Sequence, residues 1–291
     1  MPDGGASPPS GSIDWGEVLR LARRHRVQSL VARGLERLGI EAPAGIRQDA
    51  RRIVEDNLRA ADECARLADR FAAGGIDLLF VKGLSLSKLA YGDPFIKMSA
   101  DIDLLVEAAE LVGAAALLEE LGYRRQVPTR SPLATWHRLH KESLWRRPRH
   151  LVELHHRLSD NPALLDGVGM GSARQQVEIF PGSKLATLAR DPLVIYVAIH
   201  GASSGYFRLK WLADFAALLS GADDAEVDRL QCTANACGAG HAFAASVALA
   251  AEIFGTPAGV RTAEIAALPY NRRFQPLARR ALRNPAEPTD R

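Results

Sequence analysis

The sequence predicts an α+β protein in which a mixed β-sheet with helices is flanked by helical segments at both ends. Short apolar runs that end near glycine, such as residues 76–81, are typical of buried strands. The stretches before residue 74 and after residue 181 instead carry apolar residues at helical spacing. Between them, Asp101 and Asp103 alternate with apolar residues, as on one face of a strand. Helical ends around a strand-rich middle therefore define the predicted architecture.

The N-terminal part is predicted to be helical after a short tail. Residues 1–11 are mostly glycine, proline and serine, so we expect a disordered tail there. Residues 12–74 are predicted to form an N-terminal helical segment. Asp14 and Glu17 have the spacing of a capping box, which predicts where the first helix begins. A long helix over residues 44–73 ends the segment.

The predicted core, residues 75–180, opens with a strand over 76–81, a glycine at position 83 and a helix over 84–91. Such a strand, glycine and helix often hold a phosphate, because the helix N-terminus offers unpaired N–H groups and partial positive charge. Gly83 would let the backbone approach the phosphate closely. Neighbouring side chains supply the further candidate contacts Lys82, Ser85 and Ser87. Because Lys-Gly pairs occur in many ordinary turns, this signal alone does not define a site.

Two acids at positions 101 and 103 are the most informative pair in the chain. Side chains two apart on a strand point to the same face, about 6.6 Å apart, so Asp101 and Asp103 face one way and Ile102 and Leu104 face the other. Two carboxylates at that separation repel, and either a shared proton or a divalent cation relieves the repulsion. Mg²⁺ suits oxygen ligands of this kind. The alternative is that the acids lie in a solvated loop or cap the following helix.

Glu153 lies at the centre of a second strand-like run, residues 150–156. A strand over 138–145 and a turn over 146–149 are predicted to precede it, which makes a hairpin. An acid in the middle of a strand suggests a metal site or a reaction. The alternative is the solvent-facing side of an edge strand.

Histidines and tryptophans near this hairpin have two interpretations each. His155 and His156 would place a metal or an acceptor, but a solvated position at a strand edge is the preferred interpretation. Trp136 and Trp145 would stack a base, but packing in the core is preferred.

Taken together, these motifs resemble the bacterial uncharacterised nucleotidyltransferase family of the polymerase-beta-like nucleotidyltransferase superfamily. The blocks that carry the resemblance are Lys82-Gly83, Leu89-Ala90-Tyr91-Gly92-Asp93-Pro94, Asp101-Ile102-Asp103-Leu104-Leu105-Val106 and Glu153-Leu154-His155. The resemblance continues in His200-Gly201-Ala202 and Lys210-Trp211-Leu212-Ala213-Asp214 and spans roughly residues 15 to 265. The Asp-x-Asp block with its upstream Lys-Gly and Tyr-Gly-Asp is the specific part.

Carried over residue by residue, the resemblance implies a set of catalytic acids and a phosphate turn. Asp101 and Asp103 would bind the metal ions, and Glu153 would be the third carboxylate, catalytic and metal-binding. The phosphate-binding turn and its neighbours would be Lys82, Gly83, Ser85 and Lys97.

The chain departs from the family pattern at two of these positions. The usual Gly-Ser or Gly-Gly pair is Gly83-Leu84 here, with the serine one position later. Lys97 stands where relatives often carry arginine. Lysine keeps the positive charge but lacks the planar guanidinium group, which can bind a phosphate through two hydrogen bonds at once. The chain therefore matches the family pattern more closely at the metal-binding acids than at the phosphate-binding turn.

The activity that the resemblance implies is an NTP-dependent nucleotidyltransferase. Two Mg²⁺ ions, about 3.5–4 Å apart, would support in-line attack of an acceptor hydroxyl or phosphate on the α-phosphorus, and pyrophosphate would leave. The NTP is the donor substrate, and the acceptor would be a small molecule, peptide or protein, since some relatives accompany peptide natural-product genes. Two alternatives are a nucleotide-binding or sensing module of the same fold with weak catalysis, and an RNA-end modifier.

Composition limits these alternatives. A formal net charge of +3 spread over arginine pairs does not make a nucleic-acid stripe, so nucleic acid is not the expected partner. There is no apolar run of membrane-spanning length and no signal-peptide pattern, and the three cysteines form no disulfide framework, so we expect a cytoplasmic protein without a membrane partner. Residues 181–283 are predicted to form a C-terminal helical domain that begins with a helix over 184–190, and residues 284–291 a second disordered tail.

Overall fold

The computed structural model describes residues 13–284 and divides them into two compact units. The sheet unit comprises Glu55–Phe95 and Ser99–Tyr196. The helical unit comprises the described residues up to Val54, the short segment Ile96–Met98 and the described residues from Val197 onward. The predicted tail 1–11, and all but the first residue of the predicted tail 284–291, lie outside the described residues.

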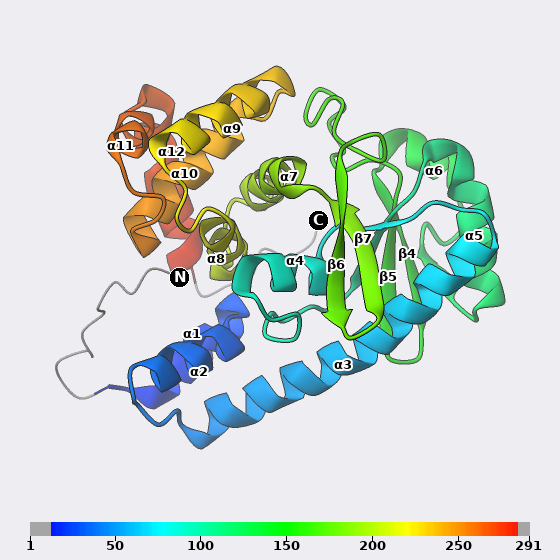
Figure 1. Ribbon diagram of the computed structural model, residues 1–291, viewed down its shortest axis with the longest axis horizontal. Coiled ribbons are helices and arrows are strands. Elements are labelled where there is room, and N and C mark those ends of the chain that lie inside the picture. The colour runs from blue at the N-terminus through cyan, green and yellow to red at the C-terminus, as the bar shows by residue number, and fades with distance from the viewer. Residues whose placement is uncertain (1–12, 285–291) are drawn as a thin grey trace. The chain divides into compact units, whose positions relative to one another are not determined.

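A five-stranded mixed sheet is the centre of the sheet unit (Figure 1). Its strands are β1 (Leu79–Phe80), β2 (Ile102–Leu105), β3 (Arg124–Val127), β4 (Glu142–Arg147) and β5 (His150–His155). They lie in the order β1-β2-β5-β4-β3, and only the β2–β5 pair is parallel. A separate hairpin of β6 (Arg174–Phe180) and β7 (Ser183–Leu188) contacts β1.

The sheet unit also contains helices that lie around this sheet. They are the second part of α3 (Ala44–Ala73), α4 (Gly83–Tyr91), the 3₁₀-helix η1 (Ala108–Glu110), α5 (Leu111–Glu120), α6 (Leu133–Leu139) and the first part of α7 (Arg190–Ser203). Because successive strand residues point to opposite faces, Leu104 and Leu154 project away from Asp103 and Glu153. These two leucines join a buried core with Leu67 of α3 and residues of α5. The opposite face is therefore available to polar side chains.

The helical unit is built around an apolar helix. Its other members are α1 (Trp15–His25), α2 (Gln28–Arg37), α8 (Leu209–Leu218), α9 (Asp224–Ala236), α11 (Val260–Ala266) and α12 (Pro269–Arg283), with parts of α3 and α7. The central helix, α10 (Gly240–Phe254), is rich in alanine and buried over most of its length. It contacts α8, α9, α11 and α12, which surround it (Figure 1). Small side chains allow these helices to approach closely.

The α+β class with a mixed sheet and flanking helices is confirmed. The long helix over 44–73 has the predicted bounds, and the Asp14 carboxylate caps α1 by accepting a hydrogen bond of 3.1 Å from the Glu17 N–H. The predicted domain boundaries at residues 75, 180 and 181 stay a prediction.

Two local predictions are wrong. Residues 183–188 form strand β7 and not a helix, because Gly182 has a φ of +82° and turns the chain back to pair with β6. The strand predicted over 138–145 begins at Glu142, since Leu133–Leu139 is the helix α6.

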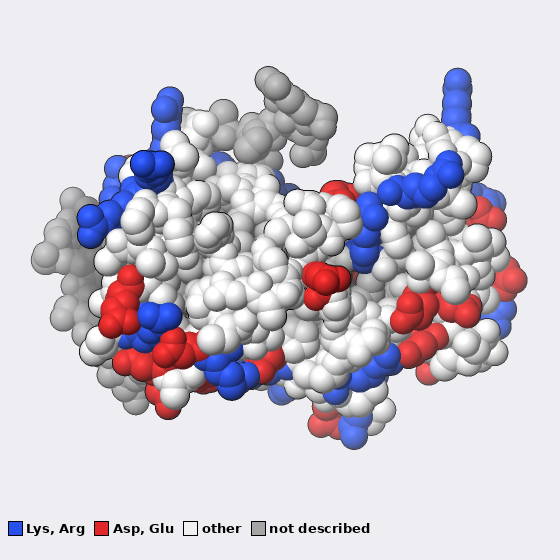
Figure 2. Space-filling model, turned by 90° about the horizontal axis from the view of Figure 1, so that it is seen from above, with Lys and Arg blue, Asp and Glu red and all other residues white. Residues whose placement is uncertain are grey.

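No helix among the described residues is both long enough and apolar enough to cross a membrane. On the face drawn in Figure 2, basic and acidic side chains lie in small separate groups with neutral surface between them.

Candidate active site on the polar face of the sheet

The parallel pairing of β2 with β5 brings together acids that are fifty residues apart in sequence. Asp103 lies opposite Glu153 in the register, and Leu105 lies opposite His155. Because all alternate residues share a face, Asp103, Glu153 and His155 project from the same side of the sheet. β5 lies between β2 and β4, so the edge-strand interpretation of Glu153 is wrong. The side chain of Asp103 is 2% exposed and that of Glu153 is 18% exposed.

Lys82 lies against both acids. It follows β1 as the N-cap residue of α4, and Gly83 after it has a φ of +62°, a conformation that side chains disfavour. The Lys82 ammonium Nζ lies 2.5 Å from Asp103 Oδ1 and 3.8 Å from Glu153 Oε2. The turn at Gly83 therefore directs a lysine to the carboxylates.

His155 is a member of the cluster, although a solvated position was the preferred interpretation of its sequence. Its Nε2 lies 3.4 Å from Asp103 Oδ1 and 3.4 Å from Glu153 Oε2, and its Nδ1 lies 3.3 Å from Glu142 Oε2. The side chain is fully buried, so the expectation of a solvated histidine is wrong. The signal in the sequence is its spacing of two from Glu153, which places both on one face of the strand.

Burial and mutual charge shift the protonation of all four groups. Burial raises the pKa of Asp103, but the Lys82 ammonium and His155 outweigh it and hold this pKa well below its usual value. Burial lowers the pKa of Lys82, but Asp103 outweighs it and the pKa lies well above its usual value. Burial and the negative charge of Asp103 raise the pKa of Glu153 to about 7. Burial lowers the pKa of His155, but Asp103 and Glu153 reverse the shift and raise it.

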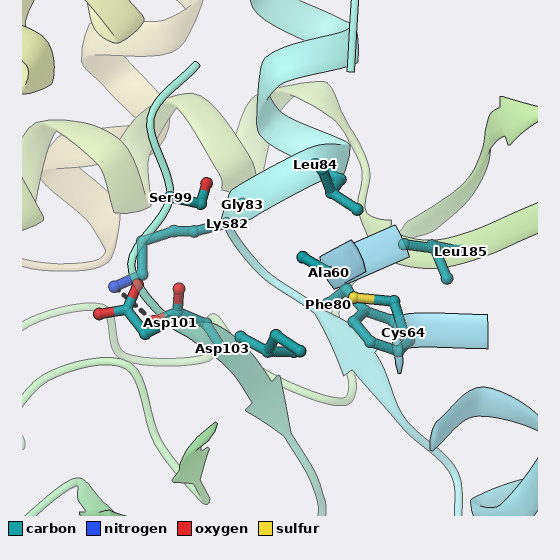
Figure 3. A pocket seen from close by; sticks show the side chains of 11 residues that line it. Ala60, Cys64, Phe80, Lys82, Gly83, Leu84, Ser99, Asp101, Asp103 and Leu185 are labelled. Atoms are coloured by element: carbon teal, nitrogen blue, oxygen red, sulfur yellow. Dashed lines mark ion pairs between the residues drawn. The ribbon is translucent and has the colours of Figure 1, made fainter. Parts of the chain in front are cut away.

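A pocket beside these residues has a polar and an apolar side (Figure 3). Lys82, Asp101 and Asp103 gather on the polar side, where the dashed line marks the Lys82–Asp103 ion pair. The apolar side is lined by Ala60, Cys64, Phe80, Leu84 and Leu185.

Asp101 and Ser85 lie near the cluster but make different contributions. Asp101 precedes β2, lines the pocket with Lys82 and is half-buried. Its negative charge helps to raise the pKa of Lys82 and of Glu153. Ser85, in the first turn of α4, is fully buried, and its Oγ has no hydrogen-bond partner among the described residues.

Lys97 belongs to the helical unit and not to the sheet unit. Its ammonium Nζ lies 3.5 Å from Asp214 Oδ2 of α8, and both side chains are buried. The predicted roles of Asp101, Asp103, Glu153, Lys82, Gly83, Ser85 and Lys97 in catalysis and in cofactor binding stay predictions.

The donor set fits a divalent metal ion. One ligand atom from each of Asp103, Glu153 and His155 lies within 4.8 Å of the others. Two carboxylates and an imidazole are common ligands of divalent first-row metals, and carboxylates suit Mg²⁺ and Mn²⁺. The ring nitrogens of His155 have no hydrogen-bond partner among the described residues, so they retain the capacity to bind one.

The two tryptophans lie in different environments. Trp145 is 1% exposed and donates a hydrogen bond of 2.9 Å from Nε1 to Ser143 Oγ, so packing in the core, the preferred interpretation, is confirmed. Trp136 stacks on His140 with ring centroids 3.6 Å apart.

Comparison with known proteins gives a match to a family model and weak likenesses to solved structures. The model of the family described as uncharacterised nucleotidyltransferase matches residues 11–255. No curated protein matches the chain.

Two solved structures show such a likeness to part of the chain. The solution structure of the antibiotic-resistance factor ANT(2'')-Ia has 14% identity and a TM-score of 0.43 over 60% of this chain and 92% of that chain. The crystal structure of an antigenic nucleotidyltransferase-like protein from Paracoccidioides brasiliensis has 17% identity and a TM-score of 0.37 over 55% of this chain and 75% of that chain.

Proposed function

Because the chain belongs to the uncharacterised nucleotidyltransferase family, we propose that it moves a nucleoside monophosphate from an NTP to an acceptor hydroxyl or phosphate. The acceptor is a group on a small molecule, peptide or protein, and pyrophosphate is the second product. This proposal makes the chain an NTP-dependent transferase.

One observation carries the proposal. Asp103 and Glu153 lie opposite each other on parallel strands, and Lys82 contacts both from the turn before α4. Buried carboxylates that face each other cost free energy unless cations compensate them. A fold that holds two such acids beside a lysine and a helix N-terminus fits a site for a metal-bound triphosphate.

The chemistry assigns one task to each group of the cluster. An oxygen–phosphorus bond forms between the acceptor and the α-phosphorus, and the bond from the α-phosphorus to the bridging oxygen of the leaving pyrophosphate breaks. Bound divalent ions, which Asp101, Asp103 and Glu153 would hold, supply charge neutralisation of the triphosphate. Glu153 takes the acceptor's proton as a general base, on the carboxylate oxygen that does not hold an ion. Lys82 offsets the negative charge that develops on the leaving pyrophosphate.

The test is direct transfer of label. The full chain is incubated with each α-labelled NTP, Mg²⁺ or Mn²⁺ and pools of candidate acceptors, and products are separated by mass. The expected result is an acceptor whose mass rises by one nucleoside monophosphate, with one pyrophosphate released for each transfer. Asp103→Asn should abolish both signals, because it removes a carboxylate from the cluster.

A matched control separates this result from a general loss of fold. Glu178 is an exposed carboxylate on strand β6, and Glu178→Gln should leave transfer unchanged. NTP binding without pyrophosphate release in the unmodified protein would overturn the proposal and favour the sensing module.

A further inference from the structure

His155 and Glu142 form a pair that the proposed transfer does not use. They lie directly opposite each other on the antiparallel strands β5 and β4. The His155 Nδ1 lies 3.3 Å from Glu142 Oε2, and Lys141 also contacts this glutamate oxygen. One ring nitrogen therefore faces Glu142, while the other faces Asp103 and Glu153.

The burial of this histidine calls for a ligand. Its side chain is 0% exposed, and none of its contacts meets hydrogen-bond geometry among the described residues. A buried polar group without a hydrogen bond destabilises the folded state, so such groups in folded proteins usually have a partner. The Nε2 is directed between two carboxylate oxygens, which is where a cation shared by these acids would lie.

The spacing also fits coordination to one ion. Ligand atoms about 2.0–2.2 Å from a single ion at octahedral or tetrahedral angles lie about 2.8–3.6 Å apart. The distance from His155 Nε2 is 3.4 Å to the Asp103 oxygen and 3.4 Å to the Glu153 oxygen. Direct hydrogen bonds of this kind are shorter, about 2.7–3.2 Å.

We propose that His155 Nε2 is a metal ligand together with Asp103 and Glu153. The Glu142 carboxylate orients the imidazole ring by accepting a hydrogen bond from the His155 Nδ1–H. This proposal rests on the proposed function only for the presence of a divalent ion in the site. Carboxylate partners at the second nitrogen are common for metal-bound histidines, because they fix the tautomer and the ring orientation. A nitrogen ligand favours Mn²⁺ and later first-row ions over Mg²⁺, which prefers oxygen ligands. The site therefore selects Mn²⁺ over Mg²⁺.

Pulsed electron paramagnetic resonance of bound Mn²⁺ tests the proposal without any turnover. The metal-free full chain is titrated with Mn²⁺ in the absence of nucleotide, and ¹⁴N coupling to the ion is measured. The expected result is a ¹⁴N coupling in the unmodified protein that disappears in His155→Gln. Affinity for Mn²⁺ should fall about tenfold or more in that variant, while affinity for Mg²⁺ changes much less.

Glu142→Gln keeps the test decisive if His155→Gln does not fold. Loss of a carboxylate behind a metal-bound histidine should weaken Mn²⁺ binding about 10–100-fold. The matched control is His241→Gln, which changes an exposed histidine of the helical unit and should alter neither the coupling nor the affinity. Mn²⁺ bound without ¹⁴N coupling, or a coupling that persists in His155→Gln, would overturn the proposal.

The outcomes separate this proposal from the proposed function. Label transfer by a protein whose bound Mn²⁺ shows no ¹⁴N coupling would overturn only the histidine ligand. A ¹⁴N coupling in a protein that transfers no nucleotide from any NTP would overturn only the transferase.

Discussion

Glu63, which is buried, and Glu153, which is half-buried, are two glutamates of the same sheet unit in opposite electrostatic situations. The Glu63 carboxylate on α3 accepts hydrogen bonds of 2.6 Å from the Tyr123 hydroxyl and 2.9 Å from Arg66, and Arg147 completes the set. Burial raises the pKa of Glu63, but Arg66, Tyr123 and Arg147 outweigh it and lower this pKa. Burial and Asp103 instead raise the pKa of Glu153 to about 7.

The difference distinguishes a structural carboxylate from one held for a ligand. Arg66 and Arg147 both donate hydrogen bonds to Glu63, so its ionised form stabilises the fold. Glu153 shares Lys82 with Asp103, and at 3.8 Å it has the longer contact. The fold thus tolerates a negative charge at Glu153 that nearby cations compensate only in part. Such a loss of stability is typical of functional sites.

The largest expected effect is on activity at Glu153. Glu153→Gln keeps the shape of the side chain but removes the charge, so nucleotide transfer should fall at least about 100-fold, because several kcal/mol of charge stabilisation are lost. The free energy of unfolding of the metal-free protein should stay the same or rise, since an unfavourable charge is removed. Steady-state transfer rates and urea unfolding measure the two effects. A variant that is both active and less stable would contradict the comparison.

Glu63→Gln should show the reverse pattern. Loss of the charged acceptor weakens the bonds from Arg66, Tyr123 and Arg147, so the free energy of unfolding should fall by about 2–3 kcal/mol. In urea, the midpoint should drop without a change in slope. The transfer rate per folded molecule should remain within about twofold, which is a change of less than 1 kcal/mol in the activation free energy. A large loss of activity in the folded variant would show that Glu63 is not purely structural.

The pH dependence of stability gives an intermediate effect. The pKa of Glu153 is raised from 4.5 to about 7, so between these values the folded state keeps a proton that the unfolded state has released. The contribution of Glu153 to stability therefore decreases as the pH rises from about 4.5 to about 7, and it is constant above that. Urea unfolding with a chelator present should show the advantage of Glu153→Gln over the unmodified protein growing through this window. A difference that does not change with pH would contradict the raised pKa.

The smallest expected effect is at the rim of the Glu63 network. Tyr123→Phe removes one hydrogen bond of 2.6 Å to Glu63 but leaves both arginines in place. The free energy of unfolding should fall by about 1–2 kcal/mol, which is less than for Glu63→Gln. In the double variant the two losses should not add, because both changes remove the same bond. Additive losses would show that Tyr123 stabilises the fold independently of Glu63.

Part of the candidate site was predictable from local patterns. The spacing of Asp101 and Asp103, and the acid at Glu153 within a strand-like run, predicted strand faces that carry acids. Gly83 marked the turn before a helix, and its φ of +62° explains why glycine occupies this position. Such features depend on neighbours within a few residues, and periodicity reports them.

His155 and the β6–β7 hairpin show where local patterns fail. Whether a strand histidine is solvated depends on which strands lie beside it, and β5 is covered by β2 and β4. The segment 183–188 carries no strict alternation of polar and apolar residues, so its pairing with β6 across Gly182 decided its conformation.

By itself, the sequence determined the mixed α+β class, the long helix over 44–73 and the residue types of the acidic cluster. Only the tertiary structure decided that Lys82 contacts Asp103, that Glu142 faces His155, and that Lys97 pairs with Asp214 in the helical unit. The physical reason is the sequence separation over which each kind of interaction acts. Helix and strand propensities act between near neighbours, whereas the parallel register of β2 and β5 joins residues fifty positions apart through packing of the whole unit.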